Sequence, residues 1–328
     1  MVHNENQFGS HCELRSKHNL LIIKVYTAVI QAQVGPLLKP LFLRGFLFKL
    51  IEKWDIIFNL DRYKQNMRYS TLLLMILFQM SFAQNSIDRL ETSPRHHEWV
   101  KIKTSTNEIN GFLVYPEVSD KVPVVLLIHE NRGLNDWARS MTDQIAEMGY
   151  IAIAPDFLSG TAPNGGGTDD YENSDAARTG IYDLDPAEIK DILNKTVDYS
   201  KNIPSSNGKV VVIGFCWGGS QSFQFATQSH KIEAAIVCYG TGPTDTASYS
   251  NIKAPVYGFY GGKDNRVNAT IPASALAMKT YGNPFEKIIY DGAGHGFFRS
   301  GENKNATQAN RLAREQGIQR LKEILEGI

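Results

Sequence analysis

Short apolar segments recur along the chain from about residue 98 onward. Residues 99–103 and 112–115 alternate apolar and polar side chains on either side of a turn-forming stretch at 104–111, which predicts an antiparallel pair of strands. The apolar runs beyond them are continuous, as is typical of strands buried on both faces. We therefore predict further strands at residues 124–128, 150–154, 210–213, 234–237, 256–260 and 287–290.

Helical patterns lie between these strands. Residues 137–148 place their large apolar side chains on one helix face, and residues 312–325 predict an amphipathic C-terminal helix. Residues 185–188 have the sequence of a capping box with proline at the first helical position, which predicts a helix start. Strands that alternate with helices imply crossover connections. The predicted fold class is α/β, a single domain with a mostly parallel central sheet covered by helices on both faces.

Residues 155–184 interrupt this alternation. Three consecutive glycines, Gly165 to Gly167, and several aspartates predict a long loop there, which we interpret as a lid or a wall of a site.

Residues 67–83 have the organisation of a secretory signal peptide. Arg68 precedes the apolar run 72–78, and small residues occupy the two positions that define a cleavage site after Ala83. The run is shorter than the roughly 20 apolar residues of a membrane span. We expect cleavage, no stable membrane span afterwards, and a mature domain at 84–328. A buried helix or an uncleaved anchor is the alternative.

A signal peptide belongs at the N-terminus of a chain, but residues 1–66 precede this one. They contain apolar stretches broken by proline and glycine, without a sustained helical or alternating period. We hypothesise that Met67 is the true start and that 1–66 are a mis-assigned extension. A membrane-associating extension is the alternative, since residues 37–54 mix apolar and basic side chains. The protein is exported, periplasmic or secreted, if the signal is used, and cytoplasmic otherwise.

Composition narrows the classes of partner. The 328 residues include 34 basic and 34 acidic ones, so the formal net charge is zero. Non-specific nucleic-acid binding needs a basic excess, so we expect no nucleic-acid partner. Three cysteines make no disulfide framework, and no cysteine–histidine cluster suggests a zinc site.

The segment GFCWGG, residues 214–219, carries the most specific chemistry. It follows a predicted strand and precedes a helix-favouring stretch, as in the Gly-x-nucleophile-x-Gly elbow, with cysteine in place of the more usual serine. The glycines are required because strand and helix pass close together at this turn. A helix N-terminus also favours a thiolate. We predict that Cys216 is the nucleophile, and that Cys238, inside an apolar strand, is structural.

Such an elbow predicts an acid and then a histidine, each after a later strand. Asp264 follows the strand at 256–260, and His295 lies on a glycine-rich loop after the last strand. We predict that His295 takes the thiol proton and later protonates the leaving group, while Asp264 orients its ring. Asp291 is the competing acid, although its closeness to His295 in sequence fits a turn residue better.

The loop after the strand at 124–128 reads HENRG, residues 129–133. With this elbow, that loop supplies one amide of an oxyanion hole, and the residue after the nucleophile supplies the other. We predict that these are the backbone amides of Asn131 and Trp217. Glu130 is a candidate second base beside the cysteine.

The segments GFCWGG, GGKD and GAGHGFF together resemble the signatures of the dienelactone hydrolase family, the carboxymethylenebutenolidases, within the α/β-hydrolase fold. The resemblance spans about residue 98 to the C-terminus. It implies that Cys216, Asp264 and His295 are the triad, and that Glu130 pairs with the cysteine and activates it when substrate enters.

The same resemblance implies two arginines that bind the carboxylate of the substrate. Arg299, four residues after the histidine, matches one of them, and Arg178, near the expected lid, is the candidate for the second. No metal and no cofactor are implied.

The leading functional hypothesis is a cysteine-dependent hydrolase of a small-molecule lactone or activated ester, with an acyl-thioester intermediate. A broader carboxylesterase on the same triad is the alternative among enzymes. A catalytically silent binding scaffold of the same fold belongs to a different class.

Overall fold

The computed structural model describes residues 86–328. The signal peptide predicted at 67–83 and the segment 1–66 lie outside the described residues, so both interpretations stay predictions.

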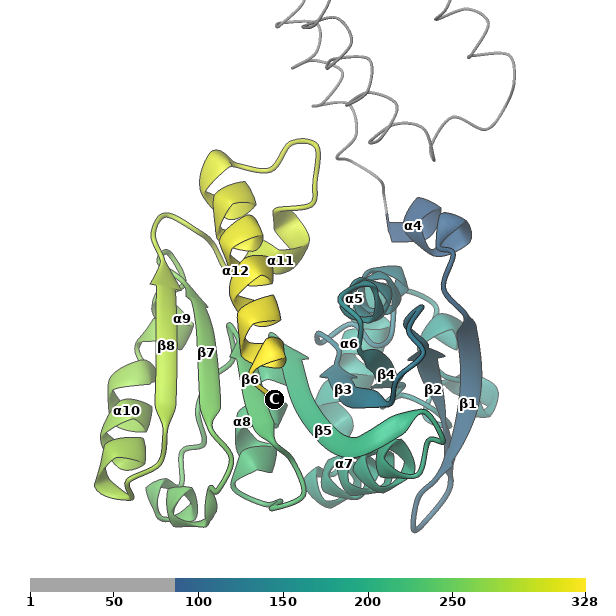
Figure 1. Ribbon diagram of the computed structural model, residues 1–328, viewed down its shortest axis with the longest axis horizontal. Coiled ribbons are helices and arrows are strands. Elements are labelled where there is room, and N and C mark those ends of the chain that lie inside the picture. Colours follow the sequence, from purple (N-terminus) through teal and green to yellow (C-terminus); the bar gives the residue numbers. More distant parts are fainter. Residues whose placement is uncertain (1–85) are drawn as a thin grey trace, which may run out of the picture. The chain divides into compact units, whose positions relative to one another are not determined.

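An eight-stranded sheet forms the centre of the described residues, in the order β1-β2-β4-β3-β5-β6-β7-β8 (Figure 1). The first two strands form an antiparallel hairpin, β2 pairs antiparallel with β4, and all later neighbours pair in parallel. The strands are β1 His97–Lys103, β2 Glu108–Val114, β3 Val122–Ile128, β4 Ile151–Pro155, β5 Ser206–Phe215, β6 Ala234–Cys238, β7 Val256–Gly261 and β8 Phe285–Tyr290. The predicted strands and the mostly parallel α/β-hydrolase sheet are confirmed.

Helices connect the strands. They are α4 Ser86–Thr92, α5 Asp136–Glu147, α6 Ser174–Asp183, α7 Pro186–Lys201, α8 Trp217–Ala226, α9 Asn265–Asn268, α10 Ile271–Thr280, α11 Phe297–Ser300 and α12 Gln308–Glu326, with short 3₁₀ turns η3 Pro163–Gly165, η4 Thr168–Asp170 and η5 Thr246–Asn251. The predicted start of α7 is confirmed, because Asp185 accepts a hydrogen bond from the Ala187 amide (2.8 Å) and Pro186 is the first helical residue. In this part of the chain, no helix is both long and apolar enough to cross a bilayer.

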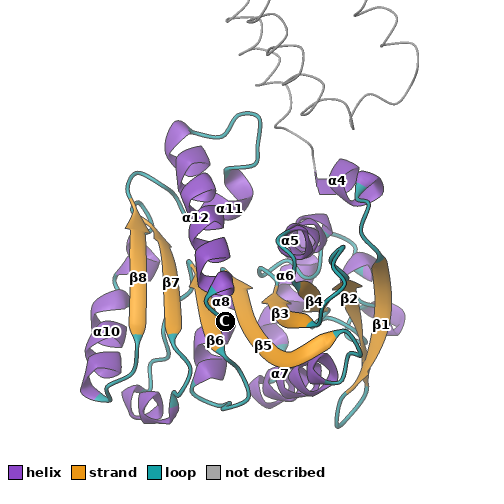
Figure 2. Cartoon of the chain, viewed as in Figure 1, coloured by secondary structure: helices purple, strands orange, loops and turns teal. Residues whose placement is uncertain are grey.

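The strands bury alternate side chains against opposite helix layers. In β3, Val125 and Leu127 belong to the apolar cluster that includes residues of α5 and α12. Val124 and Leu126 belong to the cluster that includes residues of α6, α7, α8 and α10. Because successive strand side chains point to opposite faces, a continuous apolar run requires both faces to be covered. Helices therefore cover the sheet on both faces, as predicted (Figure 2).

The expectation of an uninterrupted loop at 155–184 is wrong in its second half. Helix α6 occupies Ser174–Asp183, and the Asn173 side chain caps it by accepting from two backbone amides. The helix buries only Ala177 and Ile181, and Gly180 lies in its interior. Two buried apolar positions in a helix of ten residues make a short stripe, and the glycines and aspartates that precede it favour a loop, which is why the sequence analysis did not predict this helix.

Candidate functional site

Cys216 stands at the sharp turn between β5 and α8. Its backbone has φ 57° and ψ −114°, a conformation that non-glycine residues rarely adopt, and it is the N-cap of α8. The turn requires glycine around it. A Cβ on Gly214 would lie 1.9 Å from the carbonyl oxygen of Gly218, and one on Gly218 would lie 2.3 Å from that of Ile128. The elbow geometry that the sequence predicted is therefore present.

The structure brings Cys216, His295 and Asp264 together in a line. His295 Nε2 lies 3.1 Å from Cys216 Sγ, and His295 Nδ1 lies 2.5 Å from Asp264 Oδ2. Asp264 is nearly buried just beyond β7, where its side chain also accepts from the Val267 amide (3.4 Å). This is the arrangement expected of a nucleophile, a base and an orienting acid.

Two loops at the carboxyl edge of the sheet hold the acid and the base in place. Gly261, at the end of β7, approaches the loop after β8 so closely that a Cβ would lie 2.5 Å from the Gly294 carbonyl oxygen. The Lys263 amide donates to the Ala293 carbonyl (2.8 Å). The competing acid, Asp291, is exposed in the turn after β8, so Asp264 is the carboxylate that contacts His295.

The surroundings of His295 favour its protonated form. Burial lowers the pKa of the imidazole, but the hydrogen bonds to Cys216 and Asp264 and the negative charge of both groups outweigh burial and raise the pKa to about 9. The imidazole therefore keeps its proton at neutral pH.

Glu130 follows β3 and is buried, with its carboxylate engaged on both oxygens. Its Oε2 accepts from Arg299 Nε (2.7 Å), and its Oε1 accepts from the Tyr239 hydroxyl (3.3 Å). Burial, together with the charges of Glu130 and two cysteines, raises the pKa of Tyr239 well above its usual value, so the phenol keeps its proton. Glu130 thus contacts Arg299 and Tyr239 in this structure, whereas the sulfur of Cys216 is directed at His295.

Tyr239 was not singled out by the sequence. It follows β6 with φ 42°, and its fully buried ring packs edge-on against the ring of His295, with 5.1 Å between centroids. One side chain therefore contacts both the proposed base and Glu130. Its position directly after a parallel strand, at the same sheet edge as Cys216, was the available signal.

The predicted oxyanion amides belong to adjoining segments. Asn131 lies in the turn after β3, and Trp217 is the first residue of α8. The Asn131 side chain donates to the Tyr182 hydroxyl of α6 (3.1 Å). The predicted lid segment thus reaches the loop that carries one of these amides.

Arg178 lies on α6 with its guanidinium carbon 5.8 Å from the centre of the Tyr182 ring. The two predicted substrate arginines therefore sit on different elements, with Arg299 paired to Glu130 and Arg178 over an exposed aromatic ring. Tyr182 was missed by the sequence reasoning because no helix was expected there.

Comparison with protein families decides the assignment. Residues 109–328, well over half of the chain, match the model of the dienelactone hydrolase family. The chain belongs to the dienelactone hydrolase family. The carboxymethylenebutenolidases of Pseudomonas putida and Pseudomonas knackmussii are each 28% identical to it over 228 residues, which cover 67% of this chain and 94% of theirs. The chain is accordingly a hydrolase that acts on ester or lactone bonds of small molecules.

Solved structures agree with this dienelactone hydrolase fold. A dienelactone hydrolase-like promiscuous phosphotriesterase from metagenomic libraries gives a TM-score of 0.61 at 20% identity, covering 71% of this chain and 98% of that one. An esterase of Pyrobaculum calidifontis gives 0.54 at 16% identity, covering 76% of this chain and 92% of its own. At these identities the likeness shows the α/β-hydrolase fold alone.

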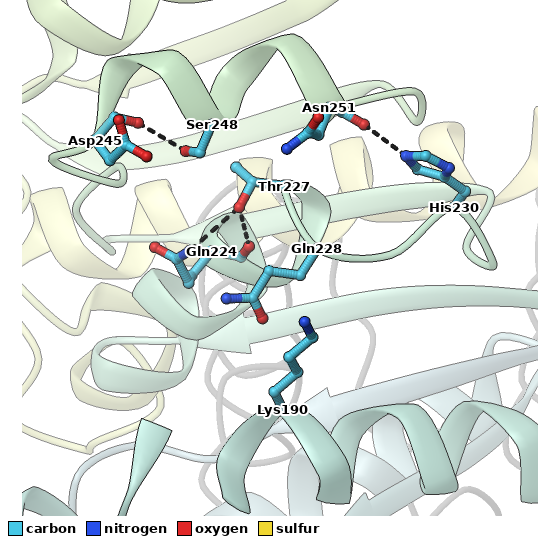
Figure 3. A pocket seen from close by; sticks show the side chains of 8 residues that line it. All are labelled: Lys190, Gln224, Thr227, Gln228, His230, Asp245, Ser248 and Asn251. Atoms are coloured by element: carbon cyan, nitrogen blue, oxygen red, sulfur yellow. Dashed lines mark hydrogen bonds between the residues drawn. The ribbon is translucent and has the colours of Figure 1, made fainter. Parts of the chain in front are cut away.

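A polar pocket of about 470 Å³ lies elsewhere on this dienelactone hydrolase family member (Figure 3). It is lined by Lys190, Gln224, Thr227, Gln228, His230, Asp245, Ser248 and Asn251. Much of its polar lining is already engaged: His230 is bonded to the Asn251 carbonyl (2.9 Å), and Gln224 donates to Thr227 (3.2 Å). Since it contains none of the triad residues, it is not the reaction site.

Proposed function

We propose that this protein hydrolyses a lactone or an activated ester with Cys216 as nucleophile, through an acyl-thioester intermediate. The observation that carries the proposal is the 3.1 Å separation between Cys216 Sγ and His295 Nε2, with Asp264 on the other nitrogen of the ring. A hydrogen-bonded nucleophile and base, with the base oriented by a third group, supports covalent catalysis.

In the first half of the reaction, His295 Nε2 holds the proton of the Cys216 thiol, the sulfur attacks the carbonyl carbon, and a carbon–sulfur bond forms while the carbonyl π electrons move to oxygen. The amides of Asn131 and Trp217 stabilise this oxyanion. Collapse re-forms the carbonyl and breaks the carbon–oxygen bond of the ester, and the leaving alkoxide takes the proton from His295 Nε2. In the second half, His295 takes a proton from water, the resulting hydroxide attacks the thioester, and the thiolate leaves.

The contact between Glu130 and Arg299 links substrate binding to this chemistry. Arg299 has a side chain that is 46% exposed, so a substrate carboxylate can reach it, and such a carboxylate competes with Glu130 for the guanidinium. Release from Arg299 leaves Glu130 free to pair with Cys216, as the family resemblance implies. Arg178 is the second arginine of this proposal.

The test is replacement of the nucleophile. Cys216→Ala is expected to lower kcat/KM for a dienelactone and for p-nitrophenyl acetate by about a thousandfold or more, because no covalent intermediate can form. Cys238→Ala, which alters the buried cysteine of β6, is the matched control and should keep activity within a few-fold. Retained hydrolysis by Cys216→Ala contradicts the proposal. If the unaltered protein neither turns over substrate nor reacts with iodoacetamide, a binding scaffold is the better assignment.

Substrate profiling separates a lactonase from a broader carboxylesterase. Arg299→Ala should raise KM for substrates that carry a carboxylate, by about tenfold or more, since one charge-assisted hydrogen bond is lost. KM for neutral p-nitrophenyl acetate should change little. An equal loss on both substrates would favour the carboxylesterase.

A further inference from the structure

His129 is a fully buried histidine that takes no part in the proton transfers described above. It lies between the end of β3 and Glu130, and its ring makes two hydrogen bonds. The Phe157 amide donates to Nε2 (3.4 Å), so the lone pair is on Nε2 and the proton is on Nδ1. Nδ1–H then donates to the Glu130 carbonyl oxygen (2.8 Å).

Electrostatics agree with a neutral ring. Burial lowers the pKa of His129, and the opposing charge of Asp156 does not reverse the shift, so the ring stays neutral. A neutral ring has one donor and one acceptor, and both are used here. His129 is thus a fixed, fully satisfied group.

The carbonyl that His129 holds belongs to the peptide unit between Glu130 and Asn131. That unit is planar and trans, so its N–H points away from its C=O and the direction of one fixes the direction of the other. The N–H in question is the Asn131 amide, the first of the two proposed oxyanion donors. The hydrogen bond to the Glu130 carbonyl therefore fixes the direction in which the Asn131 N–H points.

The same ring also contacts the segment that carries the second donor. It stacks on the Trp217 ring with 5.7 Å between centroids and 21° between planes, while Phe157 packs edge-on from another side (5.3 Å, 87°). Gly218, the next residue, would meet the His129 carbonyl oxygen at 2.5 Å if it had a Cβ, so backbone and ring of His129 both lie against the start of α8.

From these contacts we infer that His129 is a positioning residue for the oxyanion hole: its Nδ1–H fixes the Glu130–Asn131 peptide while its ring abuts Trp217. The inference rests on the proposed function and deepens it. It distinguishes His129 from His295, because the first acts on the developing oxyanion through the backbone and the second acts on the sulfur and the leaving group.

Two substitutions separate the donor from the ring. His129→Phe keeps an aromatic ring against Trp217 and removes the donor to the Glu130 carbonyl. His129→Asn removes the ring and places an amide nitrogen near the position of Nδ1. We expect His129→Phe to lower kcat for p-nitrophenyl acetate by about 10- to 100-fold with little change in KM, because an oxyanion donor is misaimed. His129→Asn should keep more of kcat than His129→Phe.

Alkylation of Cys216 by iodoacetamide provides the second measurement. That reaction is a displacement at a saturated carbon, so it needs the sulfur and His295 but creates no carbonyl oxyanion. The alkylation rate of both variants, counted per reactive Cys216, should stay within about twofold of the unaltered protein. Alkylation and hydrolysis are measured on the same folded fraction, isolated by gel filtration, so a lower yield of folded His129→Phe does not affect the result.

The possible results separate the two proposals. If alkylation falls as far as hydrolysis, or if kcat of His129→Phe is unchanged, the positioning role is overturned. The same holds if His129→Asn is the poorer of the two. None of these results bears on the assignment of Cys216 as nucleophile, which is tested separately by Cys216→Ala and by activity of the unaltered protein.

Discussion

At the scale of single residues, the charge state of His295 sets the pH range in which the proposed reaction runs. Its pKa is raised from 6.5 to about 9 because, although burial opposes protonation, Cys216 and Asp264 favour the imidazolium more strongly. Below about pH 9 the ring carries the proton that the leaving alkoxide needs. Hydrolysis should therefore hold through neutral pH and then fall about tenfold per pH unit above 9, as measured by kcat/KM from pH 6 to 10.5.

Two controls accompany this pH profile. Alkylation by iodoacetamide needs no proton donor, so its rate should not fall over the same range. Asp264→Asn removes one of the groups that raise the pKa of His295, so the alkaline fall of its residual activity should move to lower pH. A fall centred near 6.5 in the unaltered protein would mean that these two partners do not hold the proton on the ring.

The sequence indicated the triad residues that follow strands, but it did not indicate Tyr239, which also follows one, or the contacts made by packing. Cys216, Asp264 and His295 each come after a strand of a parallel sheet, and parallel strands end at one edge, so their meeting could be predicted. The hydrogen bond from Tyr239 to Glu130 joins residues 109 positions apart and depends on a strained backbone at Tyr239. Neither fact leaves a pattern in a single sequence.

At the scale of elements, the approach of α8 to β3 leaves no room for a side chain at Gly218. Gly218→Ala would place a Cβ 2.3 Å from the Ile128 carbonyl oxygen, and backbone cannot move aside cheaply. We expect a loss of about 1 to 3 kcal/mol in the free energy of unfolding, measured by denaturant titration. We also expect a lower kcat, because Gly218 directly follows Trp217, whose backbone amide is one of the two proposed oxyanion donors.

Gly327→Ala is the matched control for this substitution. Its backbone has φ −83°, which any residue adopts, and the nearest atom to an added Cβ is 3.4 Å away. The free energy of unfolding should change by less than about 0.5 kcal/mol. Equal effects of the two alanines would show that the close approach at Gly218 is not what the elbow requires.

Helix α6 shows where element prediction from periodicity stops. Its N-cap, Asn173, is a good sequence signal, but the helix has only two buried residues and leaves Tyr182 exposed. Ala177 and Ile181 pack into the same apolar core cluster as residues of α7 and α8, and the bond between Asn131 and Tyr182 ties the helix to the loop after β3. A pattern carried by two residues is too short to be told from a loop by periodicity alone when glycines and aspartates precede it.

At the scale of the whole described structure, the site joins segments that are far apart in the chain. Glu130 follows β3, near the middle of the sheet, and Arg299 belongs to α11, after the last strand, 169 residues later. Their ion pair unites a carboxylate that is 6% exposed with a guanidinium that is 46% exposed. Removing one partner should therefore destabilise the protein more than removing the other. A buried carboxylate left without its cation cannot regain its hydration, whereas an exposed guanidinium can.

A double-mutant cycle should reveal this asymmetry. Arg299→Ala leaves a buried carboxylate without its cation and should lower the free energy of unfolding by about 3 kcal/mol. Glu130→Gln leaves an arginine that water can reach and should cost less. The double variant should be more stable than the two losses together predict, with a coupling of about 2 kcal/mol from denaturant titration.

Asp198→Asn and Lys231→Ala provide the control cycle, since that pair is about half exposed on both sides, and its coupling should not exceed about 1 kcal/mol. Equal coupling in the two cycles would mean that Glu130 is solvated in solution, and that Arg299 is then free to bind a substrate carboxylate without displacing it.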